Sequence, residues 1–179
     1  SPSVSPSPSG IPDTCVTDQV QTAVDSSYSF GFLLSEEKIA QTFQPSVTAN
    51  LCNIQLMLRK NNSPSDAVQV QIYTNGTNAP GTLIATADNT IDSGTLTTTL
   101  TAYNFIFTGG PQLSLDTTYW IVISRTGELS DENYYSVASE YTSPNGLYLR
   151  GKLYISNLPS WGADNEDDLY FKEYYDNTQ

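Results

Sequence analysis

The side chains of this chain that could do chemistry are carboxylates, because its 179 residues include no histidine. Without histidine there is no Ser–His or Cys–His pair, no His-based zinc site and no ordinary general base near neutral pH. A pair of carboxylates could still hydrolyse a glycosidic bond. The candidates for such a pair are Glu128, Glu132, Glu140 and Glu173. They lie in no strand motif of a small jelly-roll glycosidase, so we predict no catalytic residues and keep the glycosidase as a lesser alternative.

An acidic segment near the C-terminal end, residues 164–168, is a candidate calcium site. Calcium prefers six to eight oxygen ligands from carboxylates and carbonyls. The spacing is not that of an EF-hand, and a solvated acidic loop is the alternative. The candidate ligands are Asp164, Glu166, Asp167 and Asp168. Apart from this possible calcium ion, we expect no cofactor.

Aromatic residues are the most suggestive feature, with twelve tyrosines and two tryptophans in the chain. Exposed aromatic rings stack on sugars and anchor protein interfaces. Aromatic residues are also common in strands for packing alone, so three interpretations stay open: strand packing, subunit contact and glycan binding. We expect Trp120 in the core. The candidate contact residues in the C-terminal third are Tyr134, Tyr135, Tyr141, Tyr148, Tyr154 and Trp161.

Two covalent modifications can be considered. Cys15 and Cys52 are too few for a zinc site, and in an oxidising compartment they would form one disulfide closing a loop of roughly forty residues. Two free buried thiols are the alternative. Asn61 and Asn75 each begin a glycosylation sequon, and both fall in predicted loops where a glycan could be carried.

The charge balance excludes several classes of partner. Seven Lys and Arg against nineteen Asp and Glu give a formal charge of −12 and a pI near 4.1. Such a chain repels nucleic acids and anionic membrane surfaces. It contains no apolar run of about eighteen residues, so we expect no membrane insertion by this chain. Ser, Thr, Asn, Gln and Tyr supply most of its polarity, which is typical of secreted β-proteins. We therefore expect an extracellular or cell-surface location.

The elements that must position these residues are strands. Apolar and polar residues alternate along 51–59 and 68–73, whereas 117–124 is apolar on both faces, as in a central strand. Segment 16–24 fits a helix or a twisted strand. The pattern predicts an all-β fold, a two-sheet antiparallel jelly-roll-like sandwich forming one domain over 13–179. Strands are predicted at 28–32, 38–43, 51–59, 68–73, 83–85, 96–101, 103–107, 117–124, 134–137, 147–155 and 169–175, with a loop at 156–167.

The N-terminal segment, residues 1–12, is rich in proline and serine. This composition is typical of an extended, semi-rigid linker or stalk. Residues 14–24 could act as an arm that adds a strand to a neighbouring subunit, because the prolines of 1–12 disfavour that role there.

Six segments of the chain occur in a familiar order: IAQTF (39–43), LCNIQLMLRK (51–60), VQVQIYT followed by NAPGTLIATA (68–87), LSLDTTYWIVIS (113–124) and W…DLYFKEYY (161–175). Together they resemble the choice-of-anchor β-sandwich modules of bacterial and archaeal surface proteins and some phage structural proteins. The resemblance covers about 35–175. It implies a sandwich attached to a surface through other segments, and it supplies no catalytic residues.

From these observations we expect a non-catalytic extracellular structural module. It would be a subunit or decoration of a surface appendage, fibre or sheath, assembling through its N-terminal arm with copies of itself or with other surface proteins. The alternative is a carbohydrate-binding module tethered by the Pro/Ser linker. We interpret the polar face of 51–87, which includes Gln69, Gln71 and Tyr73, as scaffold. Recognition is expected in the Tyr-rich C-terminal third or in the arm.

Overall fold

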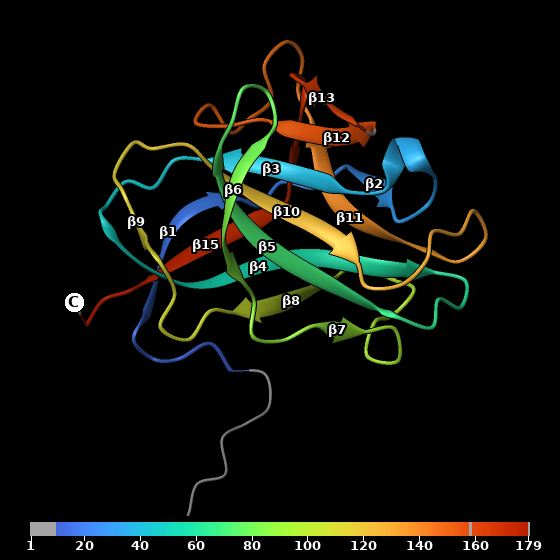
Figure 1. Cartoon of the computed structure of the whole chain (residues 1–179), viewed down its shortest axis with the longest axis horizontal. Coiled ribbons are helices and arrows are strands. Elements are labelled where there is room, and N and C mark those ends of the chain that lie inside the picture. The colour runs from blue at the N-terminus through green and yellow to red at the C-terminus, as the bar shows by residue number, and fades with distance from the viewer. Residues whose placement is uncertain (1–9, 158, 179) are drawn as a thin grey trace, which may run out of the picture.

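A computed structural model describes residues 10–157 and 159–178, and two antiparallel sheets face each other in it (Figure 1). This confirms the predicted all-β sandwich. Within the described residues the one helical element is a short 3-10 turn, η1 (Leu34–Glu36). Most of the predicted linker, residues 1–9, lies outside the described residues. Residues 10–12 belong to no strand.

The first sheet has the strand order β1-β15-β4-β11-β14, with β2 beside β11 and with β8 and β9 beside β4. All of its ladders are antiparallel. Its strands are β1 (Cys15–Gln21), β2 (Ser26–Phe30), β4 (Ala49–Asn61), β8 (Thr101–Ile106), β9 (Gln112–Leu113), β11 (Tyr134–Tyr141), β14 (Asp167–Leu169) and β15 (Phe171–Asp176).

The second sheet has the order β13-β12-β3-β10-β5-β6, with β7 beside β5. β10 lies at its centre, between β3 and β5, as expected for the apolar segment 117–124. The strands of this sheet are β3 (Ile39–Phe43), β5 (Ala67–Asn75), β6 (Pro80–Thr86), β7 (Ile91–Asp92), β10 (Tyr119–Arg125), β12 (Leu153–Asn157) and β13 (Ser160–Asp164).

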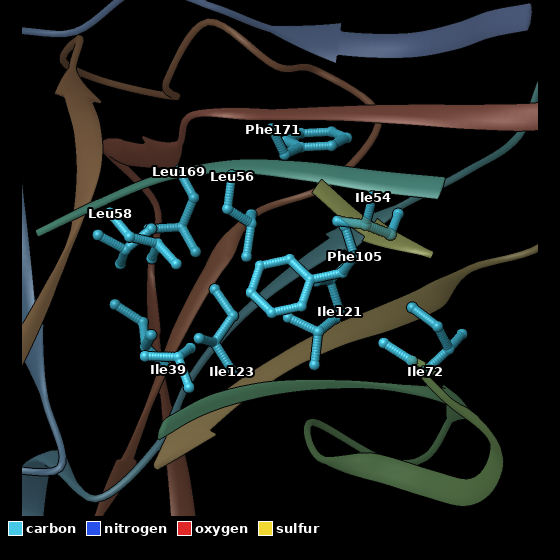
Figure 2. Packing of buried hydrophobic residues seen from close by; sticks show 14 of the residues in the cluster. Ile39, Ile54, Leu56, Leu58, Ile72, Phe105, Ile121, Ile123, Leu169 and Phe171 are labelled. Carbon is cyan, nitrogen blue, oxygen red and sulfur yellow. The ribbon is translucent and has the colours of Figure 1, made fainter. Parts of the chain in front are cut away.

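The core lies between β4 of the first sheet and β10 of the second. Period-two alternation turns Ile54, Leu56 and Leu58 to one face of β4, while Ile121 and Ile123 of β10 point back at them (Figure 2). All five side chains are fully buried. Burying a side chain of this size contributes roughly 1.5–3 kcal/mol each, so this layer holds the two sheets together.

Two predicted strands are wrong. Residues 96–100 belong to no strand and β8 begins only at Thr101; in the turn before them the amides of Thr95 and Leu96 both donate to the carbonyl oxygen of Asp92, and Leu96 is buried. The β-propensity of the threonines there does not decide the local fold, because propensity in a strand depends on neighbours to pair with. In segment 147–155 the strand begins only at Leu153, and the residues before it form a turn. Leu149 is 82% exposed and so does not lie on the core face.

The segment predicted as a loop at 156–167 instead forms a hairpin. β12 pairs with β13 from Leu153 through Asn157, so that Ser156 lies opposite Trp161, and β14 begins at Asp167. Gly151 precedes β12 where the chain passes so close to β3 that a side chain would collide with the carbonyl group of Thr42. Residues typical of turns led to the prediction of a loop in this region. In the structure they occur where the backbone passes close to a neighbouring strand.

The N-terminal arm is part of the chain's own first sheet. β1 pairs antiparallel with β15 of the same chain, so residues 15–21 form a strand rather than a helix. The predicted disulfide is confirmed: Cys15 of β1 is bonded to Cys52 of β4, with 5.9 Å between the Cα atoms. The segment expected to be donated to a neighbour is therefore paired and cross-linked within one chain.

Removing the disulfide should destabilise the sandwich measurably. The bridge joins residues 37 positions apart, and closing a loop of that length stabilises by roughly 3–4 kcal/mol in the chain-entropy model. We expect the double variant Cys15→Ser, Cys52→Ser to lose about that much free energy of unfolding in urea titrations. Dithiothreitol should destabilise the native protein equally and leave the double variant unchanged; equal stability of all these forms would contradict the prediction.

Candidate functional site

The outer face of the second sheet, the face turned away from the core, carries an aromatic cluster centred on Trp120. Ile121 and Ile123 face the first sheet, so the alternating residues Trp120 and Val122 face outward. Nevertheless both are buried, at 0% and 2% exposure. The prediction that Trp120 is a core residue is confirmed, and side chains of neighbouring strands bury it in a second hydrophobic cluster on the outer face.

The covering side chains come from three strands. The ring of Tyr154 in β12 lies 4.2 Å from that of Trp120 between centroids, and the ring of Trp161 in β13 meets it edge-on at 5.8 Å. Tyr73 lies directly opposite Trp120 on β5. We call Tyr73, Trp120, Tyr154 and Trp161 the outer aromatic cluster; both tryptophans of the chain belong to it. The indole Nε1 of Trp120 donates to Oδ1 of Asn75 at 2.8 Å.

A groove of about 310 Å³ adjoins this cluster. Its size is near the lower end of the range for small-molecule sites. Amides, hydroxyls, two cations and one tyrosine ring dominate its wall, and no lining residue is acidic. The residues of this outer groove are Thr42, Gln44, Asn75, Thr118, Leu149, Arg150, Gly151, Lys152 and Tyr154. Aromatic rings beside hydroxyl and amide groups suit a ligand with apolar faces and many hydroxyls, such as a sugar.

Several polar groups of the groove are held in place by the fold. Gln44 Nε2 donates to Thr118 Oγ1 at 3.1 Å. Lys152 N donates to Thr42 Oγ1 at 2.9 Å, and its Nζ donates to Asn165 Oδ1 at 3.2 Å. These bonds link the segment before β12 to β3 and to the connection after β13, and they link the segment after β3 to the one before β10, so the groove wall is largely pre-organised.

The guanidinium of Arg150 is held in place by three acceptors. Its guanidinium donates to the carbonyl oxygens of Gln44 and Pro45 and to Asp116 Oδ1, the last at 2.7 Å. The hydrogen bond to Asp116 raises the pKa of Arg150 further above its ordinary value. Both partners of this ion pair remain partly exposed, so the pair contributes little stability.

The six aromatic residues singled out in the sequence do not form one surface. Tyr154 and Trp161 come together in the outer aromatic cluster. Tyr135 is fully buried, stacks on Phe30 and donates its hydroxyl to Asp66 Oδ1 at 2.9 Å. Alternation along β11 turns the ring of Tyr135 into the core, so it lies apart from the outer aromatic cluster.

The other three aromatic candidates, Tyr148, Tyr134 and Tyr141, do not belong to the outer aromatic cluster. Tyr148 is buried, meets Phe171 edge-on at 5.0 Å and donates its hydroxyl to Gln19 at 2.8 Å. Tyr134 packs edge-on against Phe32. Tyr141, at the end of β11, is half exposed, and its role in binding stays a prediction.

The acidic segment spreads its side chains in different directions. Asp164 and Asp167 share the hydroxyl of Tyr28, which donates to them at 2.8 and 3.0 Å. Burial and these two carboxylates raise the pKa of Tyr28. Asp168 instead enters the interior, accepts from Gln41 Nε2 and from the Tyr148 amide, and burial raises its pKa to about 6.

The remaining candidate ligand, Glu166, accepts from the hydroxyl of Ser143. Across 10–157 and 159–178, no three acidic or cysteine side chains gather closely enough to hold a metal ion. Calcium binding by this segment thus stays a prediction, for which Asp168 would have to leave its interior hydrogen bonds.

The four carboxylates considered for glycoside hydrolysis fall into two groups. Glu128 and Glu132 are exposed in the connection between β10 and β11. Glu140 and Glu173 are each only 2% exposed. Glu140 accepts from Thr142 Oγ1 at 2.6 Å and from the Leu147 amide at 2.8 Å, so its oxygens hold the turn after β11.

Glu173 lies in β15 beneath the N-terminal strand. Its Oε2 accepts from the Gln19 amide at 3.3 Å. Burial, together with the nearby carboxylate of Asp18, raises the pKa of Glu173 to about 8. The packing of the strands around Glu173 explains why its carboxyl group is both buried and protonated.

The two sequon asparagines end strands rather than lying in loops. Asn61 is the last residue of β4, and its Nδ2 donates to Ser136 Oγ at 2.8 Å. Asn75 is the last residue of β5, is exposed, and lines the outer groove. Glycosylation of either stays a prediction; a glycan on Asn75 would occupy the mouth of the groove.

The fold has relatives among solved structures, although no family model and no curated protein matches the chain. The crystal structure of the cysteine protease and lectin-like domains of Cwp84, a surface layer associated protein of Clostridium difficile, matches 93% of this chain with a TM-score of 0.59 and 15% identity. A clostridial Cwp84 cysteine protease, an alanine variant after propeptide cleavage, matches 92% with a TM-score of 0.56 and 14% identity.

These matches concern the fold alone. This chain spans 36% and 41% of the two matched chains, and the sandwich corresponds to their lectin-like part rather than to the protease. The resemblance to choice-of-anchor modules stays a prediction, because no family model matches.

The raised pKa of Glu173 predicts a pH dependence of stability. The unfolded chain loses this proton near its ordinary pKa of 4.5, whereas the folded chain keeps it until about pH 8. The stabilising contribution is therefore fully present below about pH 4.5 and is lost as the pH rises towards about 8. We expect Glu173→Gln to reduce the fall in unfolding free energy between those pH values by an amount on the order of a few kcal/mol.

Urea titrations across this pH range measure that difference. The matched control is Glu128→Gln, which changes an exposed carboxylate and should leave the pH profile as it is in the parent protein. Parallel profiles for the parent and Glu173→Gln would show that Glu173 ionises normally in the folded state.

Proposed function

We propose that this chain is a non-catalytic carbohydrate-binding module of an extracellular or cell-surface protein. Its binding surface is the outer aromatic cluster together with the outer groove. The observation that carries the proposal is the partly exposed rings of Tyr73 and Trp161 on the same sheet face as a groove lined by amides and hydroxyls. Sugars offer apolar C–H faces to aromatic rings and hydroxyls to amides, and this surface has both kinds of group.

Rigidity of the surface favours binding. Trp120 is enclosed and hydrogen-bonded to Asn75, and it supports the rings of Tyr154 and Trp161 from below. Because Oδ1 of Asn75 is engaged by the indole, Nδ2 is the atom that this amide has to offer a ligand. A pre-organised aromatic and amide surface loses little conformational entropy when a ligand binds.

The comparisons support the proposal at the level of the fold. The structural neighbours contain a lectin-like domain of a surface layer associated protein. The Cys15–Cys52 disulfide also fits an oxidising, extracellular location. No helix among the described residues is long and apolar enough to cross a membrane.

A second candidate function is assembly through the N-terminal arm. β1 is the edge strand of the first sheet, and Val16 and Val20 on it are 38% and 47% exposed. An open edge with apolar side chains can pair with a strand of another subunit. If so, size-exclusion chromatography with light scattering should give oligomers that dissociate when Val20→Lys is introduced; a strict monomer at high concentration would contradict assembly.

The main proposal is tested by the fluorescence of the protein itself, because both tryptophans belong to the outer aromatic cluster. We expect at least one oligosaccharide in a broad panel of neutral and acidic sugars to shift the emission in a saturable titration. Trp161→Ala and Tyr73→Ala should each weaken binding about tenfold, equivalent to about 1.4 kcal/mol, measured by calorimetry.

Tyr141→Ala is the matched control, because Tyr141 is more exposed than Tyr73 and Trp161 but lies on β11 of the first sheet. It should bind like the parent protein. Trp120→Ala is unsuitable as a binding variant, since emptying a buried tryptophan site costs about 3–5 kcal/mol of stability. Failure of the whole panel, or binding unaffected by the Trp161 and Tyr73 variants, would overturn the proposal.

A further inference from the structure

The cations of this acidic protein are unevenly placed. Only seven Lys and Arg oppose nineteen Asp and Glu, yet Arg150 and Lys152 both line the outer groove, where no lining residue is acidic. By contrast Arg125 is buried in an ion pair with Asp66. A chain with a formal charge of −12 thus has one hollow whose only charged lining residues are basic.

Lys152 is the cation best placed to meet a ligand. Among the described residues it forms no ion pair, and its ammonium donates only to the neutral side chain of Asn165. Its backbone is fixed on β3, because Lys152 N donates to Thr42 Oγ1 while the Thr42 amide donates to the Lys152 carbonyl oxygen. Since Lys152 and Tyr154 are two residues apart, their side chains lie on the same outer face.

Arg150 supplies a second, partly engaged cation. Its Nε and Nη2 atoms donate to Gln44, Pro45 and Asp116, whereas no described group accepts from Nη1. The Arg150 side chain is 38% exposed. The guanidinium therefore keeps a donor edge for a ligand while Asp116 holds it in position.

We infer that the outer groove selects acidic saccharides, with Lys152 and Arg150 binding the anionic group. The inference rests on the proposed carbohydrate binding and adds the class of sugar. The ring of an acidic sugar would lie against the outer aromatic cluster, and its carboxylate would meet Lys152. Charge-assisted hydrogen bonds of this kind are roughly twice as strong as those between neutral groups.

The net negative charge of the protein does not prevent this binding. At physiological ionic strength exposed charges are screened beyond about 8 Å, so the cations inside the groove act on a bound anion more strongly than distant carboxylates do. The same screening makes the selectivity dependent on salt. A neutral sugar stacked on the rings would bind independently of salt.

The test uses a matched pair of probes: a hexuronic acid trisaccharide and the same trisaccharide with its carboxyl groups reduced to alcohols. We expect the acidic form to bind the full chain about tenfold more tightly, and this advantage to shrink when salt is raised from about 50 mM to about 500 mM. Lys152→Gln should remove most of the advantage, and Arg150→Gln part of it, measured as the ratio of the two affinities within each variant. A sulfated trisaccharide in a third arm distinguishes recognition of carboxylate from recognition of any anion.

Lys172→Gln is the control, because it removes one positive charge from β15 of the first sheet, away from the groove. It should keep the preference for the acid. Equal binding of the acidic and reduced forms overturns the inference and leaves the proposed function standing. A preference for the acid that survives Lys152→Gln and Arg150→Gln together also overturns it, since another site would then bind the anion. Binding by neither probe nor any sugar of the wider panel overturns both.

Discussion

In a two-layer sandwich each sheet has one face open to solvent, yet β10 is buried on both of its faces. Its inner residues, Ile121 and Ile123, are covered by the first sheet, and this apolar layer holds the two sheets together. Its outer residues, Trp120 and Val122, have no third layer above them. The chain must therefore bury them with side chains from the same sheet, because an exposed tryptophan at the centre of a sheet would leave a large apolar surface in water.

This requirement explains the local structure at the edge of the second sheet. The β12–β13 hairpin carries Tyr154 and Trp161 across β3 onto the indole, and Asn75 satisfies the buried indole N–H. The arrangement that stabilises the sheet also builds a rigid aromatic surface bordered by polar groups. The side chains that bury the centre of the sheet are thus the same ones that form the proposed binding surface.

The sequence predicted the fold well, because alternation in β4 and β5 and the doubly apolar β10 set the sheet faces unambiguously. It predicted the site poorly. Alternation shows that Trp120 and Ile121 point to opposite faces, but not which face has a second layer on it. Tyr73 was interpreted as scaffold for the same reason: its role depends on lying opposite Trp120, a strand pairing between residues far apart in sequence. The sequence did contain one signal: Trp120 alternates with Ile121 and Ile123, so its side chain lies on the opposite face of this central strand from theirs.

Charge, too, depends on the tertiary fold more than the composition suggests. The formal charge of −12 counts Glu173 as ionised, but burial holds the pKa of its carboxyl near 8, so at neutral pH it is largely protonated. Asp66 is neutralised by the buried guanidinium of Arg125. Most of the other acidic residues are at least partly exposed, where salt screens their charge. The charged residues that line the outer groove are both basic, so the local charge there has the opposite sign to the net charge of the chain.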